Sequence, residues 1–534
     1  MQNSISIRET YAGKHVMIVG ASGFLGKVWL AMMLERVPEV GRIYVLIRKR
    51  KGKSARERFE QMVNSTHVFQ NLHTRFGSKL SQYIWKRVEV VEGDIAQTNL
   101  GISPATAQRL YQNLDLFINC AGLVEFNPDL EQGILTNVDG TLNCARFLET
   151  CDHAALLHVS TCYVAGIREG RIPETIHLFR SPNAQSFDAE AEYKFIWEVI
   201  KLITKDRGNL EHRHQIRDVL VNEGMRRAQI WGWQNTYTYT KGLSECLLAR
   251  QSKKLRFSIF RPSIVESAIQ YPFPGWNEGF NTCGPLALLL GSWFRYLPAK
   301  DGNPFDVIPI DLVCNGLTIA GAALMLNKHS MVYQCGTSDT NLLTIDQAAK
   351  LTSLSHQIHY RRFGKTAIER IVRPYWRTVT VPKDHIFSVS NLRKITRVLV
   401  RILEQPPLQN LAKTTLEFAG RTDRKLEQIE NILELFMPFT HDYAQTFDTS
   451  SLRAIEVEEE EFRFDTKKIH WPGYWLDVHM PGLRQWCFPS IEKKKKGSFV
   501  PPIPFRLPPP QAPEQLQPSL ISSPSSVRPP SQVY

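Results

Sequence analysis

A tyrosine and a lysine at helical spacing are the first candidates for chemistry in this chain. Tyr237 and Lys241 stand four positions apart in the run Asn-Thr-Tyr-Thr-Tyr-Thr-Lys at 235–241. On a helix this spacing places both side chains on one face, about one turn apart. A nearby ammonium stabilises a phenolate, so a tyrosine with an ordinary pKa of about 10 can donate a proton near neutral pH. Many surface helices contain this spacing by chance, so the pair predicts proton transfer only together with further motifs.

A glycine-rich turn near the start of the chain is one such motif. The run Gly-Ala-Ser-Gly-Phe-Leu-Gly at 20–26 lies between an expected strand, 15–19, and an expected helix, 24–36. Glycines at this spacing permit a tight turn, a close approach of the backbone to a pyrophosphate and close helix packing, and the helix N-terminus attracts the anion. A tight turn of any α/β protein is the alternative. The predicted dinucleotide-binding residues here are Gly20, Ser22, Gly23, Phe24, Leu25 and Gly26.

Two adjacent hydroxyl residues follow a later strand. Ser160 and Thr161 come directly after the apolar run 155–159. Hydroxyls at the carboxyl end of a strand can donate to a carbonyl oxygen as negative charge develops on it. A residue that only caps the next turn is the alternative. Beside the glycine turn, Tyr237 and Lys241, the pair predicts carbonyl reduction, and the residues leave open whether Ser160 or Thr161 is the catalytic hydroxyl.

The end of the second expected strand, 42–47, indicates which cofactor the turn would hold. Arg48 and Arg50 follow this strand, and no acidic residue accompanies them. An acid at this point binds the ribose 2′-hydroxyl of NAD, whereas an arginine favours the 2′-phosphate of NADP. We therefore predict NADPH, with a solvated basic loop as the alternative.

Five further residues are candidate cofactor contacts, and four of them stand at strand ends. Asp94 and Ile95 follow the third strand, where a carboxylate and an amide can meet an adenine ring, although Asp94 could equally cap a helix. Ala121 follows the fourth strand, where a small residue lets the backbone pass under the cofactor. Asn137 is predicted either to contact the cofactor or to make a structural hydrogen bond. Pro262 removes an amide and fixes the backbone, which suits a loop over the nicotinamide.

Short apolar runs alternate with helical patterns from residue 14 onward. The predicted strands are 15–19, 42–47, 88–91, 116–119, 155–159 and 257–260. Strands rich in Val and Ile with long crossovers predict a parallel sheet covered on both faces. We predict an α/β fold: a Rossmann-type, doubly wound parallel sheet followed by a smaller, mostly helical domain and a disordered tail.

The alternation of strands and helices also suggests domain boundaries. We assign 10–340 to the dinucleotide-binding domain, with 167–233 as an inserted substrate region, and 341–489 to the helical domain. The tail, 490–534, contains four consecutive lysines at 493–496 and eleven prolines, a composition that does not form a packed core.

The composition excludes several classes of protein. The net charge of +13 is concentrated in 42–58 and in the tail, which argues against a nucleic-acid partner. Nine cysteines without C-x-x-C or metal-ligand spacing predict reduced thiols and no metal site. We expect a cytoplasmic protein, because we find neither a secretory signal nor an apolar run long enough to span a bilayer. The lysine run could add peripheral contact with anionic lipid, with a solvated tail as the alternative.

These motifs together resemble the extended short-chain dehydrogenase/reductase superfamily and, within it, the fatty acyl-CoA reductases. The segments that carry the resemblance are 19–26, 43–48, 158–164, 236–241, 261–267, 272–276 and 306–311. Val19 and Ser22 stand where the superfamily often has threonine. The 77 positions between Ser160 and Tyr237 exceed the spacing of ordinary members but suit the long insertion of acyl-CoA reductases.

The resemblance implies NADPH-dependent reduction of a long-chain acyl-CoA to the fatty alcohol, through the aldehyde and with release of CoA. In the superfamily's pattern the catalytic hydroxyl aligns best with Thr161. Tyr237 would donate the proton, while Lys241 would lower the Tyr237 pKa and bind the nicotinamide ribose. The alternatives are an aldehyde-forming reductase, another extended short-chain dehydrogenase acting on a nucleotide sugar or a steroid, and a non-catalytic NADP-binding scaffold. The sequence leaves the oligomeric state open.

Overall fold

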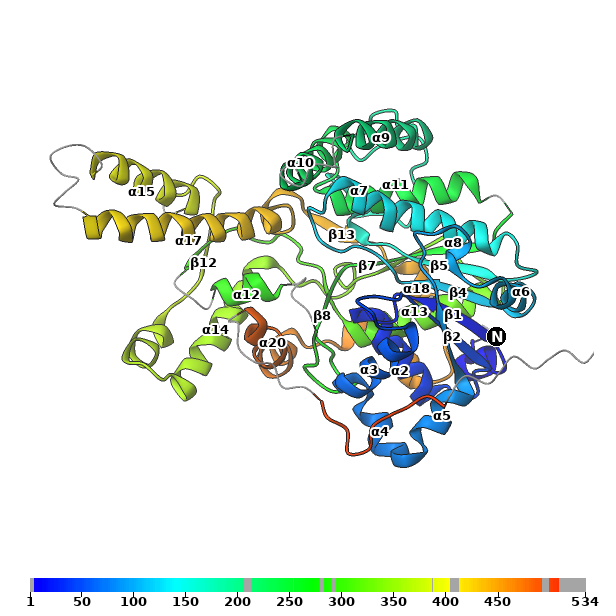
Figure 1. Cartoon of the computed structure of the whole chain (residues 1–534). Helices are drawn as coiled ribbons and strands as arrows, with labels where there is room; N and C mark the ends of the chain where they lie inside the picture. Colours follow the sequence, from blue (N-terminus) through cyan, green and yellow to red (C-terminus); the bar gives the residue numbers. More distant parts are fainter. Residues whose placement is uncertain are drawn as a thin grey trace, which may run out of the picture.

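A seven-stranded sheet occupies the middle of the molecule (Figure 1), a computed structural model. The structure describes residues 4–205, 213–252, 254–278, 283–290, 294–386, 388–403, 413–491 and 499–508. The strand order is β11 (Val332–Cys335), β7 (Phe257–Pro262), β5 (Ala155–Val159), β4 (Leu116–Asn119), β1 (His15–Val19), β2 (Arg42–Ile47) and β3 (Val88–Glu92). All neighbouring strands are parallel. The predicted doubly wound parallel sheet is confirmed, and β11 is the strand that the sequence pattern did not predict.

Helices cover both faces of this sheet, and β1 shows how the sequence builds the two layers. The covering helices include α2 (Phe24–Arg36), α3 (Ala55–Ser65), α4 (Gln70–Phe76), α5 (Leu80–Arg87), α6 (Pro104–Asn113), α8 (Gly140–Leu148), α11 (Thr236–Gln251) and α13 (Ile310–Met325). Val16 and Ile18 belong to the core that contains α2 and α13. Met17 and Val19 belong to the core that contains α6 and α8. The period of two places alternate side chains on opposite faces, as expected for a strand buried on both sides.

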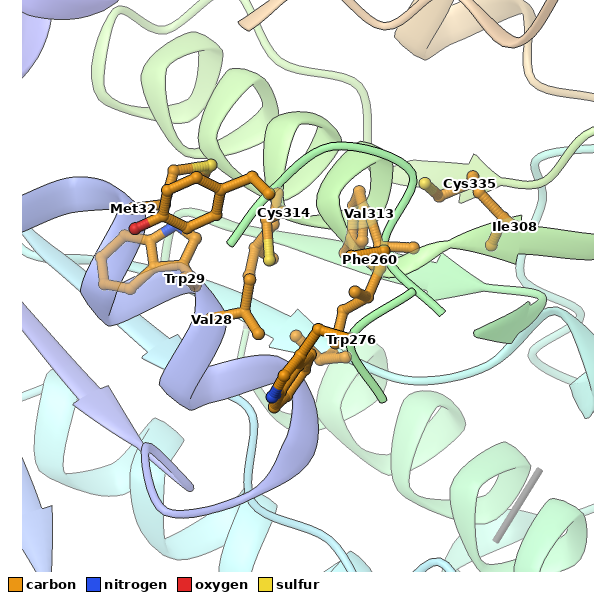
Figure 2. Close-up of a cluster of buried hydrophobic side chains, with 14 of the residues drawn as sticks. Val28, Trp29, Met32, Phe260, Trp276, Ile308, Val313, Cys314 and Cys335 are labelled. Carbon is orange, nitrogen blue, oxygen red and sulfur yellow. The ribbon is translucent and has the colours of Figure 1, made fainter. Parts of the chain in front are cut away.

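The contact between α2 and α13 fixes the helix that follows the glycine turn. Figure 2 shows Val28 and Trp29 of α2 pointing toward Val313 and Cys314 of α13. All four side chains are fully buried. Trp29 Nε1 also donates a hydrogen bond to Thr318 Oγ1 at 3.1 Å, so the indole keeps a polar partner inside the core. This packing holds the N-terminus of α2 at the carboxyl edge of the sheet.

Two segments outside the sheet are mainly helical. The insertion forms α9 (Ala189–Ile203) and α10 (Arg213–Trp231), as predicted for a mostly helical stretch. Beyond the sheet domain the chain forms α14 (Ile345–Phe363), α15 (Val389–Leu403), α17 (Lys413–Met437) and α20 (Met480–Trp486). The shorter elements are α1 (Ile7–Tyr11), α7 (Leu130–Gly133), α12 (Gly284–Leu290), α18 (Ser450–Arg453), α19 (Trp471–Gly473), α21 (Phe488–Ile491), β6 (Gly170–Ile172), β8 (Ile264–Glu266), β9 (Tyr296–Pro298), β10 (Val307–Pro309), β12 (Val379–Val381) and β13 (Gln445–Phe447).

The C-terminal segments return to the sheet domain. β13 pairs with β6 of the insertion, and Ile5 forms a bridge with Val457. Segments far apart in sequence therefore share the large core cluster, which includes residues from Ile5 to Phe505. Within the described residues, no helix is long and apolar enough to cross a membrane.

The structure differs from the predicted tail in one segment, 499–508. Phe505 is buried, and its ring lies 6.0 Å from that of Phe59 on α3. Its amide donates to Asn64 Oδ1 at 2.7 Å, and its carbonyl accepts from Asn64 Nδ2 at 2.9 Å. The amide of Leu507 also donates to Glu60 Oε1 at 2.9 Å, so apolar packing and several hydrogen bonds attach this segment to α3. The rest of the tail, 492–498 and 509–534, lies outside the described residues.

Candidate functional site

The glycine turn brings β1, α2 and the end of β4 into close contact. Gly20 has a φ of +83°, and a Cβ on it would lie 2.6 Å from the amide nitrogen of Ala121. A Cβ on Gly26 would lie 2.5 Å from the carbonyl oxygen of Gly20. Gly23 is the N-cap of α2 and donates to Gly20 at 2.9 Å. Glycine is therefore required at Gly20 and Gly26, and the exposed start of α2 fits a pyrophosphate.

The two apolar residues after the turn use their side chains for packing. Phe24 stacks on Trp276 with ring centroids 5.2 Å apart, and Leu25 packs against the large core. Ser22 is exposed at the tip of the turn. Among these three predicted contacts, Phe24 and Leu25 can therefore reach a cofactor only through the backbone. Sequence reasoning missed Lys27, which is 5% exposed and pairs with Glu278 at 2.7 Å.

Arginine side chains gather at the end of β2. Arg48 Nη1 lies 3.8 Å from Asp94 Oδ2, so two predicted cofactor residues from β2 and β3 lie together. Arg58, on α3, donates a hydrogen bond to the carbonyl of Arg48. Burial lowers the Arg58 pKa, and the charges of Arg48 and Arg50 lower it further. The sequence did not single out Arg58, because only the packing of α3 on β2 brings it to this end.

Asp94 and Ile95 lie at the end of β3, as predicted. Asp94 Oδ1 accepts a hydrogen bond from the amide of Ala96 at 3.0 Å and so stabilises the turn after β3. Its other carboxylate oxygen, Oδ2, faces Arg48. Ile95 is buried, and a Cβ on Gly140 would lie 2.7 Å from its Cδ1. Its side chain therefore packs against the start of α8, and Ile95 can contact a cofactor only through its backbone atoms.

Asn137 makes the structural hydrogen bonds that were one of its two predicted roles. Its Oδ1 accepts from the amide of Leu123 at 2.8 Å, and its Nδ2 donates to Thr240 Oγ1 at 3.0 Å. The residue is fully buried. Asn137 thereby ties the loop after β4 to α11, which carries Tyr237 and Lys241.

The candidate catalytic residues meet where β5, β7 and α11 approach each other. Asn235 caps α11 by accepting from the amide of Thr238 at 2.9 Å. Lys241 is 3% exposed, and its Nζ donates to the carbonyl of Val159 at 2.9 Å. The Thr161 side chain lies close enough to that of Tyr237 to lower its pKa. The structure therefore places Tyr237, Lys241 and Thr161 together.

Two buried hydroxyls beside this group lack partners. Ser160 Oγ and Ser263 Oγ make no hydrogen bond within the part of the chain that the structure describes. Thr161 Oγ1 donates to the carbonyl of Pro262 at 3.4 Å, which is a long hydrogen bond. Unpaired buried hydroxyls are costly, so their presence at the strand ends fits a polar group bound there.

Burial dominates the electrostatics of the site. Burial raises the pKa of Tyr237 to about 12, and the neighbouring Thr161 side chain acts to lower it. Burial lowers the pKa of Lys241 to about 8, against an opposing effect of Cys120. The lowering of the Tyr237 pKa by the Lys241 ammonium stays a prediction.

A pocket opens at the N-terminus of α11. Its lining residues come from the loop after β4, from α10 of the insertion, from the start of α11 and from α17 with the residue after it: Asn127, Met225, Gln234, Asn235, Asn431, Glu434, Leu435 and Pro438. The amide of Tyr237 donates to the carbonyl of Phe126 at 3.2 Å, next to this pocket. The Phe126 ring in turn lies 6.0 Å from Phe436 and 5.9 Å from Phe439. The pocket therefore lies between the start of α11, one residue before Thr236 and two before Tyr237, and the helix α17.

Comparison with known proteins decides the family. A family model of NAD-binding male sterility proteins matches residues 18–317. The chain is 30% identical to "Probable fatty acyl-CoA reductase 5" of Arabidopsis thaliana, covering 88% of this chain and 96% of that protein. The chain belongs to the fatty acyl-CoA reductase family. The predicted resemblance is thereby confirmed, and the protein is an oxidoreductase with a nicotinamide cofactor.

Other members and structures agree with this family assignment. The "Alcohol-forming fatty acyl-CoA reductase" of Simmondsia chinensis is 27% identical, covering 90% of this chain and 99% of that protein. The fold is similar to the crystal structure of the terminal R domain from the myxalamid PKS-NRPS biosynthetic pathway, with a TM-score of 0.51 and 17% identity, covering 85% of this chain and 89% of that chain. In this member of the fatty acyl-CoA reductase family, no group of three or more His, Cys, Asp or Glu within the described ranges could hold a metal ion.

Proposed function

We propose that the protein reduces a long-chain fatty acyl-CoA to the fatty alcohol with NADPH, through the aldehyde and with release of CoA. The observation that carries this proposal is that Thr161 lies beside Tyr237, on the helix that also carries the buried Lys241. Relatives named fatty acyl-CoA reductases, one of them alcohol-forming, support the substrate and the product.

Three arginines support NADPH rather than NADH. Arg48, Arg50 and Arg58 lie close enough for the charges of the first two to lower the pKa of the third. Asp94 is 3.8 Å from Arg48 and offsets part of this positive charge. A 2′-phosphate offers several acceptor oxygens and negative charge, which such a cluster favours.

The residues around Tyr237 suit the stabilisation of a carbonyl oxygen. NADPH, when bound, supplies the hydride. The hydroxyls of Tyr237 and Thr161 donate hydrogen bonds to the thioester oxygen as it gains negative charge. The C–S bond of the resulting hemithioacetal then breaks, and CoA leaves as a thiolate that takes a proton from water, which yields the aldehyde.

A second reduction converts the aldehyde to the alcohol. Tyr237 donates its proton to the aldehyde oxygen as a second hydride reaches the carbonyl carbon. Lys241 is held by the carbonyl of Val159, and its remaining N–H groups are available to the ribose of the cofactor. The pocket between α10, α11 and α17 adjoins this group, and we assign it to the acyl-CoA.

The experiment that tests this function follows NADPH, thiol and product together. With palmitoyl-CoA, the protein should consume two NADPH for each free thiol released and form hexadecanol. NADPH oxidation without thiol release would overturn thioester reduction. One NADPH per thiol with accumulation of hexadecanal would instead identify an aldehyde-forming enzyme.

A further inference from the structure

Exposed apolar side chains are concentrated in one stretch of the chain, 354–402. Of the 23 exposed large hydrophobic residues in the described ranges, twelve lie between these positions. Within this stretch the largest exposed fractions belong to Tyr375 at 76%, Ile371 at 68% and Ile386 at 66%, followed by Phe363 at 65%. Single exposed apolar residues are common on soluble proteins, but such a concentration marks an interaction surface.

The same stretch is strongly basic. Residues 354–402 include eleven Lys or Arg and two acidic residues, a net charge of +9. This exceeds the charge of either cluster, 42–58 or 490–534, that the sequence analysis singled out. A surface that is both apolar and cationic matches a partner that is both apolar and anionic.

α15 shows how these two properties are arranged. Ile395, Val398 and Ile402 are 52%, 53% and 53% exposed and follow one another at helical spacing. Lys394 and Arg401 are exposed on the adjacent stripe of the same helix. The helix therefore presents an apolar stripe bordered by cations, which is the pattern of an amphipathic helix that lies in a membrane interface.

Ion pairs with α17 fix this orientation. Arg393, on the opposite side of α15, is held by Asp423 at 3.2 Å, by Glu430 at 2.7 Å and by Glu427. Because the acids of α17 bind Arg393, they are turned toward α15, away from the stripe of Ile395 and Ile402. The ion pairs therefore hold α15 against α17 with its apolar stripe facing away from α17.

The surface projects from the body of the molecule. Figure 1 shows the α15–α17 hairpin and the end of α14 extending on the left, away from the central sheet. Phe363 and Tyr375 lie at the end of α14 and in the turns that follow it, and Ile395 lies on the hairpin. An extended partner can therefore reach both parts without meeting the sheet.

We propose that this surface, the exposed side chains of 354–402, docks the protein on a membrane that contains anionic lipid. The interleaving of apolar and basic residues favours lipid over nucleic acid, which offers no apolar layer to bury Ile or Val. Nine basic residues and one acidic residue of 354–402 are exposed, and two surfaces with this excess of positive charge would repel each other, which disfavours a second copy of the chain. This assignment differs from the lysine run of the tail and holds whatever the substrate of the enzyme is.

Vesicle flotation of the full-length protein tests this assignment. The protein should bind phosphatidylcholine vesicles that contain phosphatidylserine and bind pure phosphatidylcholine vesicles much more weakly. Lys394→Ala with Arg401→Ala should weaken binding about thirtyfold, because each basic residue contributes about fivefold near an anionic surface. Ile395→Ser with Val398→Ser and Ile402→Ser should abolish detectable flotation. Circular dichroism of each variant should match the wild type, since all five side chains are exposed.

Two controls separate this surface from other cationic sites. Lys467→Ala with Lys468→Ala removes two exposed lysines elsewhere and should leave flotation unchanged. Alanine at all four positions 493–496 tests the tail. Wild-type protein that does not float with anionic vesicles would overturn the proposal. Loss of flotation in the tail variant, with no loss in the variants of α15, would also overturn it. The third contrary result is a wild-type protein that binds no vesicles but self-associates in ultracentrifugation, with the triple serine variant remaining monomeric.

Discussion

The side chain of Thr161, just after β5, lies beside that of Tyr237 in the first turn of α11 and lowers its pKa. Burial of Tyr237 acts in the opposite direction and raises this pKa to about 12. The two residues are joined only by the fold, since the insertion with α9 and α10 separates them in sequence. Their pairing gives the site two hydroxyl donors that can converge on one carbonyl oxygen.

The position of Thr161 beside Tyr237 predicts that Thr161, and not Ser160, is the catalytic hydroxyl. Thr161→Ala should lower kcat about a hundredfold, the usual effect of removing one donor to an oxyanion. Thr161→Ser should retain most of the activity. Ser160→Ala should lower kcat less than Thr161→Ala, because Ser160 Oγ has no partner among the described residues, Tyr237 included. Steady-state kinetics with palmitoyl-CoA gives kcat for each variant. A larger loss of kcat for Ser160→Ala than for Thr161→Ala would identify Ser160 as the catalytic hydroxyl.

The arginine cluster predicts the cofactor preference. Arg58→Ala should weaken NADPH binding about thirtyfold, the equivalent of about 2 kcal/mol for a lost hydrogen bond to a charged group. NADH binding should not change, since NADH lacks the 2′-phosphate. Lys49→Ala, a neighbouring exposed cation, is the control. Fluorescence titration gives the dissociation constants, and an equal loss for both cofactors would show that Arg58 acts only on the fold.

The lowered pKa of Lys241 predicts a pH dependence. Because burial brings this pKa to about 8, Lys241 is charged below about pH 8 and neutral above it. The kcat/KM of the wild type should therefore fall as pH rises through this value. Lys241→Arg keeps its charge throughout and, although less active, should show no such fall. The same fall in Lys241→Arg would assign it to another group.

Much of the site follows from local sequence patterns. The runs of Val and Ile predict the strands, and the glycines of 20–26 predict the tight turn between 15–19 and 24–36, where Gly20 has a φ of +83°. The spacing of Tyr237 and Lys241 places both on α11. These features depend on neighbouring residues and on the parallel sheet, whose strand ends meet at one edge.

The remaining features depend on packing between distant segments. Arg58 reaches Arg48 only because α3 lies on β2, and Phe505 reaches Asn64 across most of the chain. The role of Asn137 could not be decided in advance, since its amide suits either a cofactor or the loop at Leu123. The type of a residue limits which groups its side chain can bind, but its actual partner depends on which segments the fold brings together.

The exchange Tyr237→Phe tests the central claim most directly, because it removes only the hydroxyl that Thr161 contacts. NADPH oxidation with palmitoyl-CoA should fall at least about a hundredfold, as expected when a general acid is removed, while the dissociation constant for NADPH stays within about twofold. The matched control is Tyr83→Phe, which also removes one hydroxyl hydrogen bond, to Leu34, on α5 away from the strand ends that hold Tyr237. The control should keep wild-type activity. Undiminished turnover by Tyr237→Phe would contradict the assignment of Tyr237 as the proton donor.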